Sequence, residues 1–342
     1  MNAPAPHHGS RIGVLDGWRA VSILLVLAAH MLPLGLPQWR LNSAAGPAGM
    51  SIFFTLSGFL ITSGLLDRAA AIPFLVRRVA RIVPLAFVAS TLVLLAQGAS
   101  LHDYLSLWFF YWNYDPTPDA IERVSHFWSL CVEMQFYVMV AGIVAVLGRR
   151  GLVLLPFLGL LVTAMRVGQQ QPINIMTHLR LDEILAGCTL ALALRGELGR
   201  GGDRILAFLR GVPWPLVAGV FLVSCHLASG AFQYARPWLG ASLVGITLVR
   251  STWLNPWLCI RPFRYVAEIS YALYVIHPLT MYGWMGTGDF VVRYAKRAVS
   301  IALSVLLAHV STFTFERRFT DWGRRLSKRF EPREAPSAVR VA

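Results

Sequence analysis

Long stretches without a single charged residue dominate this sequence. Residues 20–39, 41–66 and 82–101 contain no Asp, Glu, Lys or Arg. Each stretch has at least the roughly 20 residues that a helix needs to cross the hydrocarbon core of a bilayer. The same pattern continues along the chain. It predicts ten membrane-spanning helices, at residues 18–37, 46–66, 82–99, 126–147, 151–167, 180–195, 211–229, 236–250, 265–285 and 297–316.

Two features qualify this simple pattern. The fifth, sixth and eighth segments are short, so the sequence defines their ends less sharply. The aromatic segment Tyr104–Tyr114 is too short to span, and we expect it at the membrane surface or as a re-entrant piece, because Trp and Tyr rings favour the headgroup level. The sequence thus predicts an all-α integral membrane protein, a bundle of about ten transmembrane helices.

Composition supports this class. Hydrophobic residues make up 56% of the chain and charged residues 14%, whereas soluble domains contain about 25% charged residues. The net charge of +14 would favour nucleic-acid binding in a soluble protein, but here the arginines fall between apolar stretches, so we expect no nucleic-acid partner. The four cysteines lie in apolar runs without CxxC spacing. We expect them to be buried thiols rather than disulfides or zinc ligands.

The distribution of Lys and Arg predicts the orientation of the bundle. With the N-terminus in the cytoplasm, 23 of the 31 basic residues fall on the inner side of the ten-helix arrangement, as the positive-inside rule requires. We therefore expect a multi-pass protein of the cell (inner) membrane with both termini in the cytoplasm. Its parts are a short N-terminal segment (1–17), a membrane domain (18–316) and a basic tail (317–342) that suits anionic lipid headgroups.

The first expected helix carries candidate catalytic residues. Asp16 and Arg19 lie at its cytoplasmic end, and His30 follows 11 residues after Arg19. In a helix the Arg19 and His30 side chains point within about 20° of each other and are about 16 Å apart along the axis. Imidazole can accept a hydroxyl proton near neutral pH, as acyl transfer to an alcohol requires. The alternative is that His30 only forms a polar contact between helices.

An arginine cluster precedes the third expected helix. Arg78 and Arg77 lie three and four residues before Arg81, so all three can share one helical face. Guanidinium groups bind phosphates through paired hydrogen bonds, and acyl-coenzyme A is a cytosolic ligand with several phosphates. The spacing fits an acyl-CoA site, although arginines that only fix the topology would show the same pattern.

Further ionisable residues lie within the apolar segments. His126 and Glu133 are seven residues apart, about two turns along one face of the fourth expected helix. Glu133 needs a partner such as an arginine or a histidine, which fits either a structural ion pair or a catalytic or acceptor-binding role. Arg180 and Asp182 at the outer end of the sixth helix, and His277 in the ninth, complete this set.

In their order along the chain, these motifs resemble those of the integral-membrane acyltransferase type 3 family, the bacterial O-acyltransferases of polysaccharides and related acceptors. The matching segments cover nearly the whole chain: Leu15–Ala20 with His30, Gly49–Ile61, Arg78–Pro84, His126–Tyr137, Arg180–Asp182 and Ile269–His277. The departures from the family pattern, at Trp18, Ala267 and Arg317–Arg318, do not touch the expected chemistry.

The resemblance implies transfer of an acyl group, usually acetyl, from cytosolic acyl-CoA to a hydroxyl of a glycan or other cell-envelope acceptor. The catalytic residues it implies are His30, Asp16, Arg19 and Glu133, with Arg78 and Arg81 binding acyl-CoA. The candidate acceptor site comprises His126, Tyr137, Arg180, Asp182 and His277. We expect acyl-CoA as co-substrate, no bound cofactor or metal, and no added extracytoplasmic hydrolase-like domain.

Two other classes of protein explain part of the pattern. A transporter or flippase of a glycan or lipid-linked precursor would use the buried charges as a translocation path. Such proteins often contain internal repeats, which this sequence does not display. A purely structural membrane subunit explains the hydrophobicity but not the histidine, glutamate and arginine residues at depth. The sequence does not identify the acceptor (carbohydrate or small molecule), the acyl group or the oligomeric state.

Reporter fusions test the expected topology. The arginine distribution predicts a cytoplasmic signal after Leu66, Leu147, Leu194 and Glu316, and an outer signal near Asp115 and Asp289. Paired fusions to green fluorescent protein and alkaline phosphatase measure this, because the first fluoresces in the cytoplasm and the second is active outside. A cytoplasmic signal at Asp115 would contradict the helix count.

Overall fold

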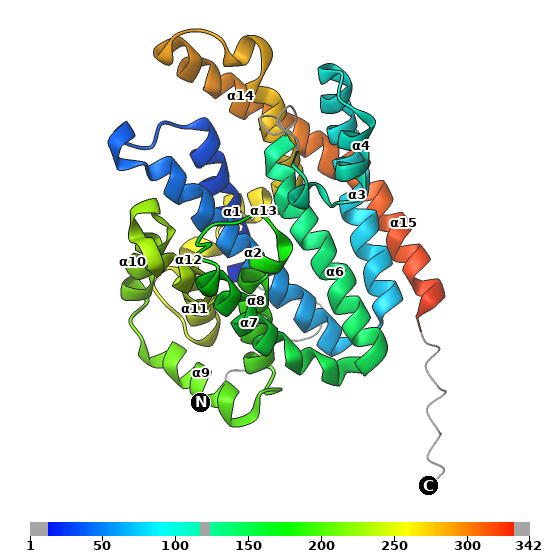
Figure 1. Cartoon of the computed structure of the whole chain (residues 1–342), viewed down its shortest axis with the longest axis vertical. Helices are drawn as coiled ribbons and strands as arrows, with labels where there is room; N and C mark the ends of the chain where they lie inside the picture. Colours follow the sequence, from blue (N-terminus) through cyan, green and yellow to red (C-terminus); the bar gives the residue numbers. More distant parts are fainter. Residues whose placement is uncertain (1–12, 117–123, 332–342) are drawn as a thin grey trace.

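The computed structural model describes residues 13–116 and 124–331, and every regular element within them is a helix (Figure 1). The first half of the chain forms α1 (Gly13–Met31), α2 (Leu41–Asp67), α3 (Ala71–Gln97), α4 (Leu101–Trp108), α6 (Trp128–Leu147) and α7 (Leu155–Gly168). The second half forms α8 (Asp182–Leu194), α9 (Gly199–Gly211), α10 (Trp214–Cys225), α11 (Arg236–Val249), α12 (Asn255–Leu258), α13 (Arg261–Ile276), α14 (Phe290–Val310) and α15 (Arg317–Ser327). The expected all-α class is confirmed.

Several helices are long enough to cross a membrane. In the described part of the chain, five helices or continuous helical runs are both long and apolar enough: Gly13–Met31, Leu41–Asp67, Ala71–Gln97, Ser125–Gly168 and Phe290–Phe330. A sixth span is possible if α9 and α10, which are bent by 101°, count as one. The expectation of several apolar spans is therefore confirmed, but the count of ten is not.

The difference in count arises mainly from three short helices. The expected spans at 180–195, 236–250 and 265–285 appear as α8, α11 and α13, which have 13, 14 and 16 residues. At 1.5 Å per residue, α8 is about 20 Å long, well short of the roughly 30 Å hydrocarbon core. α8 is buried along nearly its whole length, so its apolar side chains pack against other helices rather than facing lipid.

The first helix ends at Met31 rather than at residue 37, shortly before Pro33, and a side chain caps this end. The Asn42 amide Nδ2 donates to the carbonyl oxygens of Ala29 (2.8 Å) and Leu32 (2.6 Å). These bonds satisfy carbonyls that the end of a helix leaves without partners. As a consequence, His30 lies in the last turn of α1.

The helices α2 and α8 cross in direct backbone contact. A Cβ atom on Gly58 would lie 1.9 Å from the carbonyl oxygen of Ile184, and one on Gly187 would lie 2.0 Å from that of Thr55. No side chain fits at either position, so the two helices approach as closely as their backbones allow, as in other helix pairs with small residues at the contact.

The remaining helices pack on both sides of this crossing. On one side α3, α6 and α15 run alongside one another, with α3 packed against both α6 and α15 (Figure 1). On the other side α11 packs against α2 and α8, and α10 packs against α2 and α11 (Figure 1). The helix α1 contacts both α2 and α13. The buried apolar side chains accordingly form two clusters, one on each side.

The four cysteines are free thiols. Cys131, Cys188 and Cys225 are buried, as the apolar sequence context predicts. Cys259 is exposed, so the expectation of burial is wrong for this residue. It caps the C-terminal end of the four-residue helix α12, where the chain turns before α13 begins.

The same substitution at two glycines tests the α2–α8 crossing. We expect Gly187→Ala to destabilise the protein by about 1–3 kcal/mol, because its methyl group overlaps the Thr55 carbonyl. Gly142→Ala in α6 is the matched control. It meets open space and should stabilise by up to about 1 kcal/mol, since Ala favours a helix over Gly. Thermal melting of purified protein measures both, and equal melting temperatures would contradict the close crossing.

Candidate active site

Five helices enclose a small pocket, which we call the arginine pocket. Side chains of α1, α2, α3, α6 and α13 surround a cavity of about 60 Å³, which has room for only a few water molecules. Its charged and hydroxyl-bearing lining residues are Arg19, Ser22, Ser57, Arg78, Arg81, Glu133, Tyr137, Ser270, Tyr271 and Tyr274. Four residues from three separate sequence motifs, Arg19, Arg78, Arg81 and Glu133, therefore meet in one site.

Three arginines form the cationic part of this pocket. Arg19 comes from α1, and Arg78 and Arg81 come from α3. The Arg78 guanidinium lies over the rings of Phe74 (5.7 Å to the centroid) and Tyr137 (5.6 Å), which fixes its orientation. Within the described residues, none of the three arginines has a carboxylate oxygen within 4.0 Å. The pocket therefore presents positive charge that is not neutralised by direct ion pairs.

Hydroxyl groups, rather than the expected arginine or histidine, bind Glu133. Its Oε1 atom accepts hydrogen bonds from Ser57 Oγ (2.6 Å) and Tyr137 Oη (2.5 Å). Ser57 reaches it from α2, and Tyr137 lies one turn further along α6. Glu133 is buried, so these two donors satisfy a carboxylate that would otherwise be costly at this depth. Asp16 does not line the pocket, but it interacts electrostatically with Arg19.

Three histidines from distant parts of the sequence form a second cluster. His30 Nδ1 lies 2.8 Å from His277 Nε2, although the residues are 247 positions apart. Their rings are nearly parallel, with an angle of 10° between the planes. The ring of His126 lies 5.8 Å from that of His277. His277 and His126 are buried, whereas His30 is exposed, so the accessible imidazole of this cluster is that of His30.

The hydrogen bonds of this cluster assign the protons on the two paired imidazoles. His277 Nδ1 faces the carbonyl oxygens of Tyr274 (2.9 Å) and Leu273 (3.1 Å), so Nδ1 carries the proton. In a neutral ring Nε2 is then an acceptor, and His30 Nδ1 must be the donor to it. His30 Nε2 is left with a free lone pair, the form that a general base requires.

Tyr274 connects the pocket to the histidine cluster. It lines the pocket, and its ring centroid lies 6.0 Å from that of His277 and 5.7 Å from that of His126. Its hydroxyl donates to the His126 carbonyl oxygen at 2.6 Å. Phe53 of α2 stacks on it, with 6.3 Å between centroids and 5° between planes. Both rings line the arginine pocket, and Tyr274 is its contact with the histidines.

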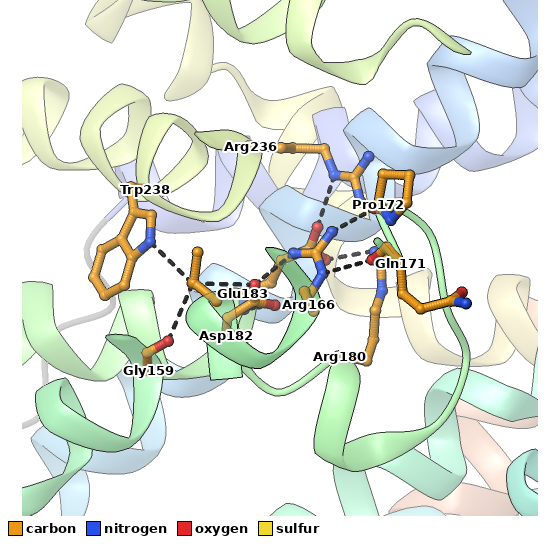
Figure 2. Close-up of polar contacts among 10 residues, drawn as sticks. Gly159, Arg166, Gln171, Pro172, Arg180, Asp182, Glu183, Arg236 and Trp238 are labelled. Atoms are coloured by element: carbon orange, nitrogen blue, oxygen red, sulfur yellow. Dashed lines mark hydrogen bonds and ion pairs between the residues drawn. The ribbon is translucent and has the colours of Figure 1, made fainter. Parts of the chain in front are cut away.

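Arg180 and Asp182 lie in a different place, a buried ion-pair network that also contains Arg166, Glu183 and Arg236 (Figure 2). Asp182 pairs with Arg166 of α7. Glu183 Oε1 accepts from Arg236 Nε of α11 at 2.9 Å. Arg180 Nη2 lies 3.2 Å from Glu183 Oε2. The network joins α7, α8 and α11, and neither Arg180 nor Asp182 lines the arginine pocket.

Three members of this network do not figure among the sequence-predicted site residues. Arg166 and Arg236 are fully buried, and so is Glu183. A signal for them is present in the sequence. Both arginines lie within or beside apolar segments, where an arginine is rare unless it has a partner, and Glu183 stands three residues after Arg180 on a helix. What the sequence does not give is which acid meets which arginine.

Within residues 13–116 and 124–331, no group of three or more His, Cys, Asp or Glu side chains is arranged to hold a metal ion. The three histidines share one hydrogen bond between two rings instead of converging on a common point.

Curated relatives of the chain are bacterial acetyltransferases. YrhL of Bacillus subtilis (strain 168), whose name assigns it provisionally as a peptidoglycan O-acetyltransferase, is 28% identical over 317 residues, covering 79% of this chain and 48% of YrhL. O-acetyltransferase OatA of Staphylococcus aureus (strain NCTC 8325 / PS 47) is 25% identical, covering 77% and 49%. Peptidoglycan O-acetyltransferase OatA of Listeria monocytogenes is 24% identical, covering 77% and 48%. The chain thus spans about half the length of these relatives.

No solved structure matches the chain significantly. The family model described as an acyltransferase domain, acyltransferase 3, matches residues 12–315. This match includes all the helices that form the arginine pocket and the histidine cluster. The chain therefore belongs to the acyltransferase 3 family.

Proposed function

We propose that this chain transfers an acetyl group from cytosolic acetyl-CoA to a hydroxyl of a cell-envelope glycan of the peptidoglycan type, with His30 as the general base. The family and the names of the relatives support the reaction class and the kind of acceptor. The observation that carries the assignment of His30 is its hydrogen bond to His277, which leaves Nε2 free to take a proton.

We assign the donor to the arginine pocket and the reaction with the acceptor to the histidine cluster. Arg19, Arg78 and Arg81 offer guanidinium groups without carboxylate partners within 4.0 Å in the described structure, and these suit the phosphates of the donor. In the proposed topology they lie toward the cytoplasm, where acetyl-CoA is made. His30 lies at the other end of α1, toward the outer side. The acetyl group therefore travels from the arginines to the histidine past Tyr274.

The proposed reaction uses one base, His30, and one leaving group, the CoA thiolate. As the acceptor oxygen attacks the thioester carbon, His30 Nε2 takes the hydroxyl proton and a C–O bond forms. The tetrahedral intermediate then collapses, the C–S bond breaks and the CoA thiolate leaves. The imidazolium of His30 returns its proton to the thiolate, which yields CoA thiol and the O-acetyl ester.

In this mechanism His277 is a positioning residue. Its Nε2 atom accepts a hydrogen bond from His30 Nδ1–H, and its own Nδ1–H donates to two backbone carbonyl oxygens. Both contacts hold the His30 ring in one orientation and one tautomer, the role that a third group plays in other base-assisted acyl transfers. Beside this cluster, the Nε2 atom of buried His126 has no hydrogen-bond partner among the described residues.

Substitution of His30 tests the general base. We expect His30→Gln to lower transfer by about 10²–10⁴-fold, because Gln keeps a polar side chain but cannot take a proton at neutral pH. The measurement is the acetate that mild alkali releases from cell-envelope glycan, in a deletion strain complemented with each variant. Immunoblots of the membrane fraction establish equal protein levels.

The matched control is His309→Gln. His309 lies on α14, where its ring bonds only the Tyr265 hydroxyl among the described residues, and we expect transfer within about twofold of the wild type because the side chain is remote from the reacting groups. If His30→Gln retains more than about a third of the wild-type transfer, His30 is not the general base. Such a small loss is what a merely bridging hydrogen bond predicts, because a hydrogen bond between membrane helices contributes only about 0.6 kcal/mol.

A double substitution tests the donor site. We expect Arg78→Ala with Arg81→Ala to weaken acetyl-CoA binding by about tenfold or more, because two charge-assisted phosphate contacts are lost. Isothermal titration of purified protein measures the affinity. Arg149→Ala is the control, since Arg149 pairs with Glu197 away from the pocket. Unchanged affinity in the double variant would show that these arginines serve the membrane topology alone.

A further inference from the structure

A second hollow adjoins the arginine pocket near the end of α2 and the start of α3. It has a volume of about 290 Å³ and lies between α2, α3 and α15. Arg78, Arg81 and Leu60 line both this hollow and the inner pocket, so the two are neighbours that share one wall. The second hollow adds Arg68, Arg77 and Arg324. We call these three the outer arginines because they line only the second hollow and not the inner pocket; the name does not refer to a face of the membrane.

The outer arginines are brought together by tight helix packing. Arg68 follows the end of α2, and Arg77 lies in α3. Arg324 comes from α15, which is seated directly on α3: a Cβ on Gly323 would lie 2.3 Å from the Cβ of Ala80. That contact places Arg324 beside the α3 arginines although nearly 250 residues separate them. The hollow is therefore a built feature of three helices and not a chance gathering of one charged segment.

An internal anion already lies at the rim of the hollow. Glu331 Oε1 is 3.4 Å from Arg77 Nη1 and 3.8 Å from Arg68 Nη1. The Ser327 hydroxyl accepts a hydrogen bond from the same Arg77 nitrogen at 3.4 Å. Glu331 thus contacts two of the five arginines that line the hollow, and Arg324 pairs with exposed Asp321 of its own helix. Arg78 and Arg81 have no carboxylate oxygen within 4.0 Å in the described structure. The hollow retains a large positive excess that favours a multiply charged anion.

We propose that the outer arginines bind the terminal 3′-phosphate of the donor nucleotide, and that Glu331 occupies this place until the donor displaces it. The inference rests on the proposed function, in which the donor is acetyl-CoA. Coenzyme A carries a diphosphate in the middle and a phosphate monoester at the end remote from its thioester. With the thioester directed into the inner pocket, Arg78 and Arg81 face the diphosphate and the outer arginines face the monoester.

Paired ligands test this assignment. We expect the full-length protein, purified in uncharged detergent, to bind CoA more tightly than 3′-dephospho-CoA. Combined replacement of Arg68, Arg77 and Arg324 by Gln should weaken CoA binding by about tenfold, since each exposed pair contributes about two- to fivefold. Binding of 3′-dephospho-CoA should stay within about twofold. Arg325→Gln, which changes an arginine of α15 that does not line the hollow, should leave both affinities unchanged.

Glu331→Gln provides an independent arm of the test. Removal of the competing carboxylate should raise CoA affinity by about two- to fivefold, with little change for 3′-dephospho-CoA. The gain should shrink as salt is added, because exposed charges are screened. A loss of CoA affinity in this variant would show that Glu331 orders the site instead of competing for it, and would overturn the displacement.

The outcomes separate this inference from the proposed function. A wild type that binds CoA and 3′-dephospho-CoA equally well overturns the role of the outer arginines and leaves acetyl-CoA as donor. A wild type that binds neither ligand overturns both. Phosphatidylglycerol offers the same phosphate chemistry, so its retention by each variant is measured in parallel. If the triple variant loses this lipid but keeps the wild-type preference for CoA, the outer arginines bind lipid and the inference is wrong.

Discussion

The backbone contact between α2 and α8 is the constraint on which the rest of the structure depends. Because Gly58 and Gly187 leave no room for side chains between the helices, the position of α2 is fixed against the most deeply buried helix. One face of α2 then presents Ser57 and Phe53 to the arginine pocket. The short helix α8 in turn begins with Asp182 and Glu183, which hold α7 and α11 through ion pairs. The site is therefore placed by packing that is remote from its chemistry.

The two groups of buried charges differ in how their charge is balanced. Arg166 and Arg236 each meet a carboxylate at hydrogen-bonding distance, and such pairs in an apolar interior are strongly destabilised when one partner is removed. In the described structure the arginines of the pocket lack such a carboxylate, and the nearby Glu133 is bound by hydroxyls. Charge left unbalanced in this way favours an incoming anion, whereas the balanced network favours a fixed arrangement of helices.

The sequence predicts individual helices and their faces well, because both depend on residues close together in the chain. The all-helical class, the burial of Glu133, and the common face of Arg78 and Arg81 follow from local spacing. Helix lengths do not follow from local spacing, because an apolar run such as α8 has the same sequence pattern whether lipid or protein surrounds it. The cap at the end of α1 comes from Asn42, which acts across a turn, and hydropathy does not register a capping side chain.

Contacts between distant segments are the part of the site that one sequence does not provide. His30 and His277 are identified separately as polar residues at depth, but their direct bond across 247 positions requires knowledge of how α1 and α13 pack. The same holds for Arg324 and the α3 arginines, which meet because α15 packs on α3. Physical reasoning on spacing supplies the candidates, and tertiary structure decides which of them act together.

The aromatic pair of Phe53 and Tyr274 bears on the ion gradients across the membrane. A water-filled path from the arginines to the histidines would let protons and ions flow down their gradients across the bilayer. Tyr274 is anchored by its bond to the His126 carbonyl and by stacking on Phe53, so its ring is fixed where the arginine pocket meets the histidines. Under the proposed function, a donor that displaced these rings would fill the opening with its own pantetheine arm. The substrate would thus serve as the seal for the passage that it creates.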